Sequence, residues 1–294
     1  MSTARSWKLL EILEETTRFF SDREVPDARL QAELLLADVL GLKRLDLYLQ
    51  FDRPLHVEEV DRYRDFVRQR LRRVPLQYII GTAAFRHLEL SVTPEVLIPR
   101  PETEILVDIA LEKIADLSAP RCLDMCCGSG AIALSLAYEN TLAQVVGSDV
   151  SETALAVAAR NAELCGLANR VEWLSGDLFG SVTERLFELI ACNPPYVRHA
   201  DIASLQPEVQ QFEPHLALDG GEDGLDFYRR IAQDSASFLS TGGYLLLEVG
   251  DGQAEQVAQL LQDAALYSGV DVQADLNDIP RIVIAQKTAE TDHG

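Results

Sequence analysis

The residues with the clearest chemical potential are Asn193-Pro194-Pro195-Tyr196, which directly follow an apolar run at residues 189–192. Two prolines fix the backbone and remove two amide donors, so nearby carbonyl oxygens are left without local partners. The Asn193 carboxamide adds an acceptor, and Tyr196 adds an aromatic face. Such a set suits a planar NH2 group whose nitrogen attacks an electrophilic methyl group. The alternative interpretation is a chance turn at the end of a strand.

A glycine-rich turn joins a predicted strand to a predicted helix. It reads Asp124-Met125-Cys126-Cys127-Gly128-Ser129-Gly130. Glycines allow the backbone to approach a ligand closely, and a helix start favours a carboxylate or phosphate. Steric needs alone also place glycine in such turns. The G-x-G-x-x-G pattern and the Walker A lysine are both missing, so an adenosine-type ligand with an amino-acid carboxylate fits better than a dinucleotide.

Two acids follow the next strands of the same predicted sheet. Asp149 lies about 20 residues beyond the glycines, a spacing at which a carboxylate accepts hydrogen bonds from ribose hydroxyls. It could equally begin the helix at residue 152, as could Ser151. Asp177 could accept a hydrogen bond from the adenine amine while Leu178 or Phe179 covers the ring. The alternative for these residues is a turn with two core side chains.

Alternating strands and helices position these residues. The patterns predict strands at residues 121–125, 144–149, 171–174, 186–192, 244–249, 270–274 and 282–286, with helices at 131–138, 152–164, 225–239 and 254–265. A further helix follows Pro101, which is tolerated in a first turn. Such alternation predicts an α/β fold with a doubly wound, mainly parallel seven-stranded sheet. Ligands bind at the carboxyl edge of such sheets.

The first part of the chain has a different pattern. Helical spacing predicts helices at residues 7–20, 30–39 and 57–71, the second starting at Pro26 and Asp27 and ending at Gly41. In the third, Val60, Tyr63, Val67 and Leu71 should face inward, and Arg62, Arg64, Arg68, Arg70, Arg72 and Arg73 mostly outward. Residues 78–92 predict a hairpin, with Phe85, Leu88, Leu90 and Val92 alternating. We therefore expect a small all-α N-terminal domain joined by a β-hairpin linker.

Composition and charge exclude several classes of protein. Residues 1–80 carry 14 basic and 14 acidic side chains, so the net charge of −21 falls on residues 81–294. A strongly acidic body disfavours contact with phosphate backbones, so direct nucleic-acid binding is not expected. The five cysteines show no zinc spacing and predict reduced thiols, and no metal site is expected. Glu11, Glu14 and Glu15 interrupt any signal peptide, and no apolar run could span a membrane, so a cytoplasmic location is expected.

Together these motifs resemble the class I S-adenosylmethionine-dependent methyltransferases. Within them, the chain is similar to the family that methylates the glutamine amide (N5) in the Gly-Gly-Gln motif of peptide chain release factors. The resemblance covers nearly the whole chain and includes Pro75-Leu76-Gln77-Tyr78, Leu97-Ile98-Pro99-Arg100-Pro101-Glu102-Thr103-Glu104, the glycine-rich turn, Asn193-Pro194-Pro195-Tyr196 and Phe212-Glu213-Pro214. It implies a role in translation termination.

The resemblance also implies roles for individual residues. S-adenosyl-L-methionine would be held by Asp124, Cys126, Cys127, Gly128, Ser129, Gly130, Asp149, Asp177, Leu178 and Asn193. Asn193, Pro194, Pro195 and Tyr196 would bind the substrate glutamine, with Asn193, Pro194 and Tyr196 catalytic. The implied domains are a substrate-recognition domain (1–77), a linker (78–95), a methyltransferase domain (96–288) and a tail (289–294).

Two other substrates stay open at this stage. The family loop usually reads D-x-G-x-G-x-G, and Cys126 stands at its first glycine. A similar cysteine occurs in the sister family that methylates a glutamine of a large-subunit ribosomal protein. The stretch at residues 100–104 favours the release-factor branch. DNA adenine N6-methyltransferases share an N-P-P-Y type motif, but they need a basic duplex-binding surface and a base-flipping pocket.

Overall fold

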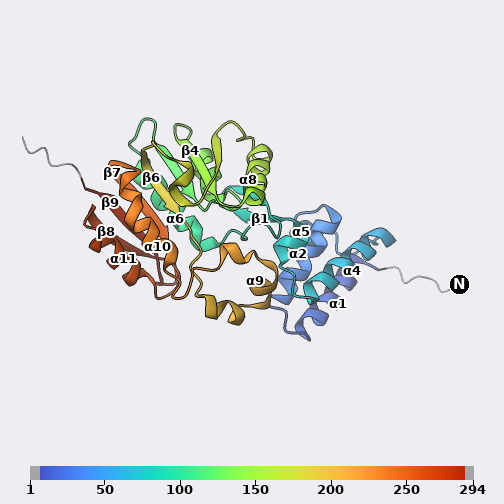
Figure 1. The fold of residues 1–294 in the computed structure, drawn as a ribbon. Coiled ribbons are helices and arrows are strands. Elements are labelled where there is room, and N and C mark those ends of the chain that lie inside the picture. The colour runs from blue at the N-terminus through green and yellow to red at the C-terminus, as the bar shows by residue number, and fades with distance from the viewer. Residues whose placement is uncertain (1–6, 289–294) are drawn as a thin grey trace, which may run out of the picture. The chain divides into compact units, whose positions relative to one another are not determined.

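The chain forms two compact units in the computed structural model, which describes residues 7–288 (Figure 1). The N-terminal unit comprises the chain up to Gly81 together with Pro207–Phe212. The sheet unit comprises Thr82–Gln206 and the chain from Glu213 onward. The predicted tail at residues 289–294 lies outside the described residues. The predicted domain boundaries after residues 77 and 95 stay predictions.

Helices build the N-terminal unit. They are α1 (Leu9–Ser21), α2 (Ala28–Leu40), α3 (Asp46–Leu49), α4 (Val57–Leu71), α5 (Leu76–Ile80) and α9 (Pro207–Phe212). Asp27 precedes α2 and Gly41 follows it with a φ of 62°, as the sequence predicts. Phe20 and Tyr63 lie in the apolar interior, where the Tyr63 hydroxyl donates a hydrogen bond to the Ala32 carbonyl at 3.1 Å.

The arginine-rich helix α4 departs from expectation at Arg70, whose predicted outward position is wrong. Its side chain is buried and donates hydrogen bonds to Gln31, to the Val74 carbonyl at 3.3 Å and to Glu208 at 2.6 Å. Arg73 lies 2.8 Å from the same carboxylate. Helix α9 is therefore held by Arg70 of α4 and by Arg73, which follows that helix. Local periodicity could not predict this, because Glu208 lies 138 residues from Arg70 in the sequence.

A seven-stranded sheet forms the second unit, in the order β5-β4-β3-β6-β7-β9-β8. The strands are β3 (Arg121–Met125), β4 (Gln144–Asp149), β5 (Val171–Ser175), β6 (Phe187–Cys192), β7 (Leu239–Glu248), β8 (Tyr267–Ala274) and β9 (Pro280–Lys287). Neighbours pair in parallel except for β9, which is antiparallel to β7 and β8. Met125 is in register with Ser148 and Cys192, so β3, β4 and β6 end at one edge. The predicted doubly wound sheet is confirmed.

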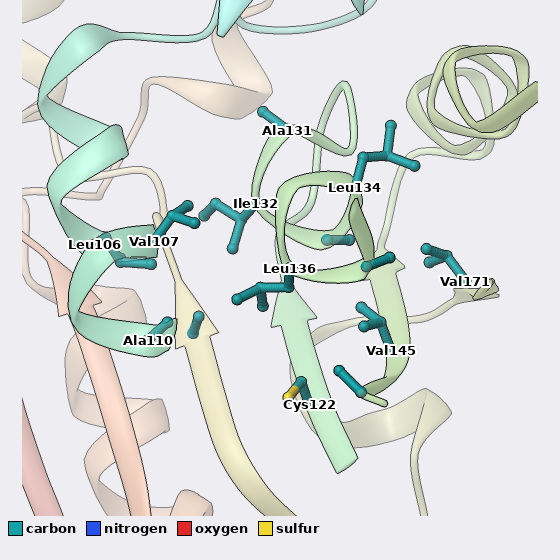
Figure 2. Close-up of a cluster of buried hydrophobic side chains, with 14 of the residues drawn as sticks. Leu106, Val107, Ala110, Cys122, Ala131, Ile132, Leu134, Leu136, Val145 and Val171 are labelled. Atoms are coloured by element: carbon teal, nitrogen blue, oxygen red, sulfur yellow. The ribbon is translucent and has the colours of Figure 1, made fainter. Parts of the chain in front are cut away.

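Helices cover both faces of this sheet. One face packs against α6 (Pro101–Ile114), α7 (Ala131–Glu139) and α8 (Glu152–Leu164), the other against α10 (Asp226–Asp234) and α11 (Ala254–Asp263). Figure 2 shows the first of these cores, where side chains of α6 and α7 meet Cys122 of β3 and Val145 of β4. The next residue, Leu123, belongs to the opposite core. Burial on both faces explains the nearly continuous apolar strands.

The predicted hairpin is confirmed in part. Strands β1 (Thr82–Phe85) and β2 (Leu88–Ser91) pair antiparallel, and Phe85 and Leu90 are buried in the sheet unit. Its predicted start at residue 78 is wrong, since the chain is helical (α5) up to Ile80. Gly81 ends that helix with a φ of 87°. One helical turn is too short to produce a recognisable period.

Other errors cluster between residues 176 and 243. The helix predicted at residues 225–239 ends at Asp234, and a 3₁₀ helix follows at Ser235–Ser237. Strand β7 begins at Leu239 instead of residue 244, because it continues through two glycines that hide its alternation. Further 3₁₀ helices at Leu178–Ser181, His199–Ser204 and His215–Ala217 were not predicted. Across residues 7–288, none of the helices is both long enough and apolar enough to span a membrane.

Candidate active site

A pocket within the sheet unit opens at the carboxyl edge of the sheet. It is lined by Pro94, Glu95, Val96, Leu97, Cys126, Gly128, Asp149, Val150, Ser151, Thr153, Ala154, Asn193, Pro195, Pro214, Leu216, Ala217 and Phe227. The residues that follow β3, β4 and β6 therefore meet in one cavity. The strand order reverses between β3 and β6, and such a reversal is where ligands bind in doubly wound sheets. Four of the ten predicted cofactor residues line the pocket: Cys126, Gly128, Asp149 and Asn193.

Asp149 ties the glycine-rich turn to the start of α8. Its Oδ2 accepts a hydrogen bond from the Gly128 amide at 2.9 Å, and its Oδ1 accepts one from the Ser151 amide at 2.9 Å. The helix cap itself is Ser151, whose hydroxyl accepts from the Ala154 amide at 3.2 Å. Asp149 therefore keeps free lone pairs at the pocket wall. Its position is compatible with the predicted contact to a ribose.

Asp124 lies beneath the turn and is fully buried. Its Oδ2 accepts a hydrogen bond from the Ala133 amide in the first turn of α7, at 2.9 Å, while its Oδ1 has no partner among residues 7–288. Burial raises the pKa of this carboxyl to about 8, against the opposing effect of the Ala133 hydrogen bond. An orphaned buried oxygen next to the turn is a polar atom that a bound ligand could satisfy.

The turn itself needs unusual backbone angles. Cys126 has a φ of 60°, in the left-handed region that glycine enters most easily. Cysteine adopts it here, at the position where the D-x-G-x-G-x-G pattern has its first glycine. Cys127 and Ser129 are buried away from the pocket lining, and the Ser129 carbonyl accepts from Asn161 at 2.9 Å. Gly130 is closely approached by the Trp173 ring, 2.8 Å from where a Cβ would lie.

Asp177 and Leu178 are not brought into the pocket wall. The Asp177 carboxylate pairs with Arg230 at 2.7 Å, and Leu178 is buried in the core. The chain just before them is nevertheless fixed beside the pocket, because the Gly176 amide donates to the Asp149 carbonyl at 3.0 Å. Their contact with adenine stays a prediction.

The segment Asn193-Pro194-Pro195-Tyr196 is held from the opposite side by Gln253. Its Nε2 donates to the Tyr196 carbonyl at 3.0 Å, and its Oε1 accepts from the Gly250 amide at 2.9 Å. Burial raises the pKa of the Tyr196 phenol to about 12, so the ring stays neutral near pH 7. Within the described chain, the Pro194 carbonyl accepts no hydrogen bond from another residue. Asn193 and Pro195 line the pocket, whereas Pro194 and Tyr196 do not.

The Asn193 side chain is anchored by two residues to which the sequence assigned no role. Its Nδ2 donates to the Thr103 hydroxyl at 3.3 Å, and that hydroxyl donates to Glu248 Oε2 at 2.6 Å. Glu248 also accepts a hydrogen bond from Asn193, and burial raises the pKa of its carboxyl to about 7. A sequence signal existed for Glu248, because an acid at the end of an apolar strand is rarely buried without a partner.

A partly buried ion pair joins two segments of the pocket wall. Arg100 donates to Glu213 at 2.6 Å, and the Ile98 amide donates to the other carboxylate oxygen at 3.4 Å. The loop that carries Leu97 is thereby linked to the loop that carries Leu216. Arg100 belongs to the motif at residues 97–104 and Glu213 to the motif at residues 212–214. Their ion pair explains why both stretches accompany the site.

Comparisons with known proteins agree with this geometry. Residues 11–81 match the model of the PrmC N-terminal domain, and residues 102–221 match that of the methyltransferase small domain. The catalytic domain of hMettl16, solved with a 3′UTR hairpin, shares the fold with a TM-score of 0.57 over 80% of this chain and 81% of that one, at 15% identity. The fold is therefore that of the class I methyltransferases.

Curated relatives extend the match to nearly full length. The release factor glutamine methyltransferase of Geobacter sulfurreducens is 44% identical over 277 residues, covering 94% of this chain and 96% of the relative. That of Chlorobaculum tepidum is 39% identical over 290 residues, covering 96% and 98%. Neither the ribosomal-protein nor the DNA-adenine alternative is favoured by these matches. The chain belongs to the release factor glutamine methyltransferase family.

Proposed function

We propose that this protein transfers a methyl group from S-adenosyl-L-methionine to the side-chain amide nitrogen of the glutamine in the Gly-Gly-Gln motif of class I peptide chain release factors. The single observation that carries the chemistry is the state of Asn193. Its NH2 group is used by Thr103 and Glu248, so its Oδ1 is the atom left for a ligand in the pocket. The names of the curated relatives support the substrate.

The pocket offers the chemistry that S-adenosyl-L-methionine requires. Asp149 offers acceptors suited to ribose hydroxyls, and exposed Val150 offers an apolar surface suited to adenine. Gly128, with a φ of 52°, brings the backbone close to the cavity without a side chain. When bound, the cofactor supplies the electrophilic methyl group. Asp124 would act from beneath the turn, where its carboxyl group accepts a hydrogen bond from the Ala133 amide at the start of α7.

The residues at the end of β6 would bind and orient the substrate amide. An amide nitrogen is a poor nucleophile because its lone pair is delocalised. Asn193 Oδ1 and the Pro194 carbonyl are two acceptors for the two protons of a planar NH2 group. Holding that group in attack geometry can contribute about 7–11 kcal/mol to lowering the barrier. A general base is not required, because the extra proton leaves after the methyl group has moved.

The experiment combines purified protein, labelled S-adenosyl-L-methionine and three acceptors: intact release factor, the large-subunit ribosomal protein and a DNA duplex. The expected product is release factor with one added methyl group on the Gly-Gly-Gln glutamine. Asn193→Ala should lower turnover about 100-fold or more, as loss of a positioned polar group does in other enzymes, while cofactor affinity stays near wild type. Equal losses in turnover and cofactor affinity would show that Asn193 is structural. Methylation of either other acceptor in preference would overturn the proposed substrate.

Recognition of the protein substrate is assigned to the N-terminal unit, although the arginines of α4 are poor candidates for it. They are paired within the unit: Arg62 with Asp38, Arg64 with Asp61 and Arg68 with Asp65. The exposed apolar side chains of the segment at residues 45–51 are better candidates. Leu45, Leu49 and Phe51 are 72%, 80% and 55% exposed, and such patches often mark protein interfaces.

Leu49→Asp tests this assignment. It should lower kcat/KM for intact release factor about tenfold, as loss of an interface anchor does, and leave methylation of a short Gly-Gly-Gln peptide unchanged. Leu142→Asp is the matched control, because this leucine of the sheet unit is 60% exposed. An unchanged kcat/KM for the intact factor in Leu49→Asp would remove the patch from consideration. The proposal includes a cytoplasmic location, since release factors act on ribosomes there.

A further inference from the structure

Three side chains from separate elements meet at the pocket wall: Asn193 lines the pocket, and two buried side chains lie behind it. Thr103 comes from the first turn of α6, Asn193 follows β6, and Glu248 ends β7. Thr103 and Glu248 are 5% and 2% exposed, and neither lines the pocket. The hydrogen bond between Thr103 and Asn193 links them to the pocket lining. They can therefore act on a bound substrate through the Asn193 amide.

The direction of the hydrogen bonds in this group follows from chemistry. An ionised carboxylate only accepts hydrogen bonds, so the single proton of the Thr103 hydroxyl goes to Glu248, over 2.6 Å. The lone pairs of that hydroxyl then remain for the Asn193 NH2 group, at 3.3 Å. Glu248 accepts from the same NH2 group. The Asn193 NH2 group is thus engaged inside the protein, and the oxygen is the atom left for the pocket.

We propose that Thr103 and Glu248 are positioning residues that lock the Asn193 amide with its oxygen toward the substrate, and that this lock makes the site select a carboxamide over a carboxylate. The inference rests on the proposed function and adds its specificity. A glutamine NH2 group donates to Asn193 Oδ1. A glutamate carboxylate in the same place would bring its oxygen lone pairs against those of Asn193 Oδ1, and the two acceptors would repel each other. Rotation of the Asn193 amide by half a turn would reverse this preference.

The lock depends on the charge of Glu248, which several groups influence. Burial is the main cause that raises the pKa of this carboxyl, and the charge of Glu102 of α6 adds to it, while Thr103 and Arg281 of β9 lower it. The charge of Glu248 helps to raise the pKa of the Tyr196 phenol. The Tyr228 hydroxyl of α10 donates a hydrogen bond to the Glu248 backbone carbonyl at 2.8 Å. A protonated Glu248 could donate a hydrogen bond to Thr103. The direction of the hydrogen bonds among Thr103, Glu248 and Asn193 would then no longer be fixed. Selectivity should therefore fall as the pH drops below about 7.

The test measures selectivity, which a general loss of stability would not change. Release factor carrying Gln→Glu in its Gly-Gly-Gln motif serves as competitor, and the quantity is its inhibition constant divided by the KM of normal release factor. In Glu248→Gln, the new NH2 group can donate to Thr103 and reverse the bonds. We expect this ratio to fall at least about tenfold. This is a small part of the discrimination that a hydrogen-bonding site can achieve between two substrates. Thr103→Val should lower the ratio less, because Glu248 still accepts from Asn193, and Thr103→Ser should restore it.

Matched controls come from the N-terminal unit, where Thr16 and Glu33 are buried to similar degrees, at 7% and 2% exposed. Thr16→Val and Glu33→Gln should leave the ratio unchanged whatever they do to stability. If Glu248→Gln keeps the wild-type ratio while its turnover falls, the lock is wrong and Glu248 serves stability alone. Wild-type protein that methylates no release factor refutes the proposed function itself, and the inference with it.

Discussion

Replacing Glu208 with glutamine should destabilise the N-terminal unit strongly. This carboxylate lies 2.6 Å from Arg70 and 2.8 Å from Arg73, and the Arg70 and Glu208 side chains are only 4% and 12% exposed. Burial acts to raise the pKa of Glu208, but the hydrogen bond and charge of Arg70, with the charge of Arg73, outweigh it and lower the pKa. The pair is thus attractive on balance. Removing one partner of a buried pair costs about 3–5 kcal/mol, because the other charge stays buried without compensation.

The assay can be confined to this unit, because the two tryptophans of the chain lie in different units. In a Trp173→Phe background, the fluorescence of buried Trp7 reports denaturant unfolding of the N-terminal unit. Asp65→Asn is the control, since it breaks a pair with Arg68 whose side chains are 67% and 64% exposed. Exposed pairs contribute about 0–1 kcal/mol. A loss below about 1 kcal/mol in Glu208→Gln, or equal losses in both variants, would refute the reasoning.

Three further predictions concern the sheet unit. Its free energy of unfolding should fall as pH rises from about 5 to 8, by up to about 1.4 kcal/mol per pH unit for each group, in denaturant titrations at several pH values. The reason is that Asp124 and Glu248 have pKa values of about 8 and 7 in the folded protein, while in the unfolded chain they release their protons near the ordinary values of 3.8 and 4.5. Asp124→Asn should make the free energy of unfolding less dependent on pH. A free energy of unfolding that rises with pH in this range would contradict the prediction. Gly147→Ala would place a Cβ 2.3 Å from the Trp173 ring and should cost about 1–3 kcal/mol by calorimetry, so an unchanged Tm would show that the ring moves freely. Cys126→Gly should be about 1 kcal/mol more stable than Cys126→Ala, because only alanine keeps the left-handed backbone penalty at a φ of 60°; equal stabilities would show that this penalty is absent.

The sequence predicted the sheet well because each strand is a short apolar run bounded by turn residues. The ranges of β3, β4 and α8 agree with the predicted ones, and Asn193 and Pro195 of the asparagine-diproline motif line the pocket. Prediction failed where structure depends on distant partners. Arg70 looks like a surface arginine until Glu208 is placed beside it, and Thr103 looks like an ordinary helix start until Glu248 and Asn193 meet it.

The hexapeptide Pro207–Phe212 has a consequence for exchanging parts between relatives. It is a stretch of the sheet portion of the sequence that folds as part of the N-terminal unit, so the backbone passes between the two units at three places. One junction therefore cannot separate them. A hybrid that takes its first 81 residues from one species and the remainder from another would inherit a mismatched α9. Transplanting the hexapeptide together with the leading segment should restore a well-folded hybrid.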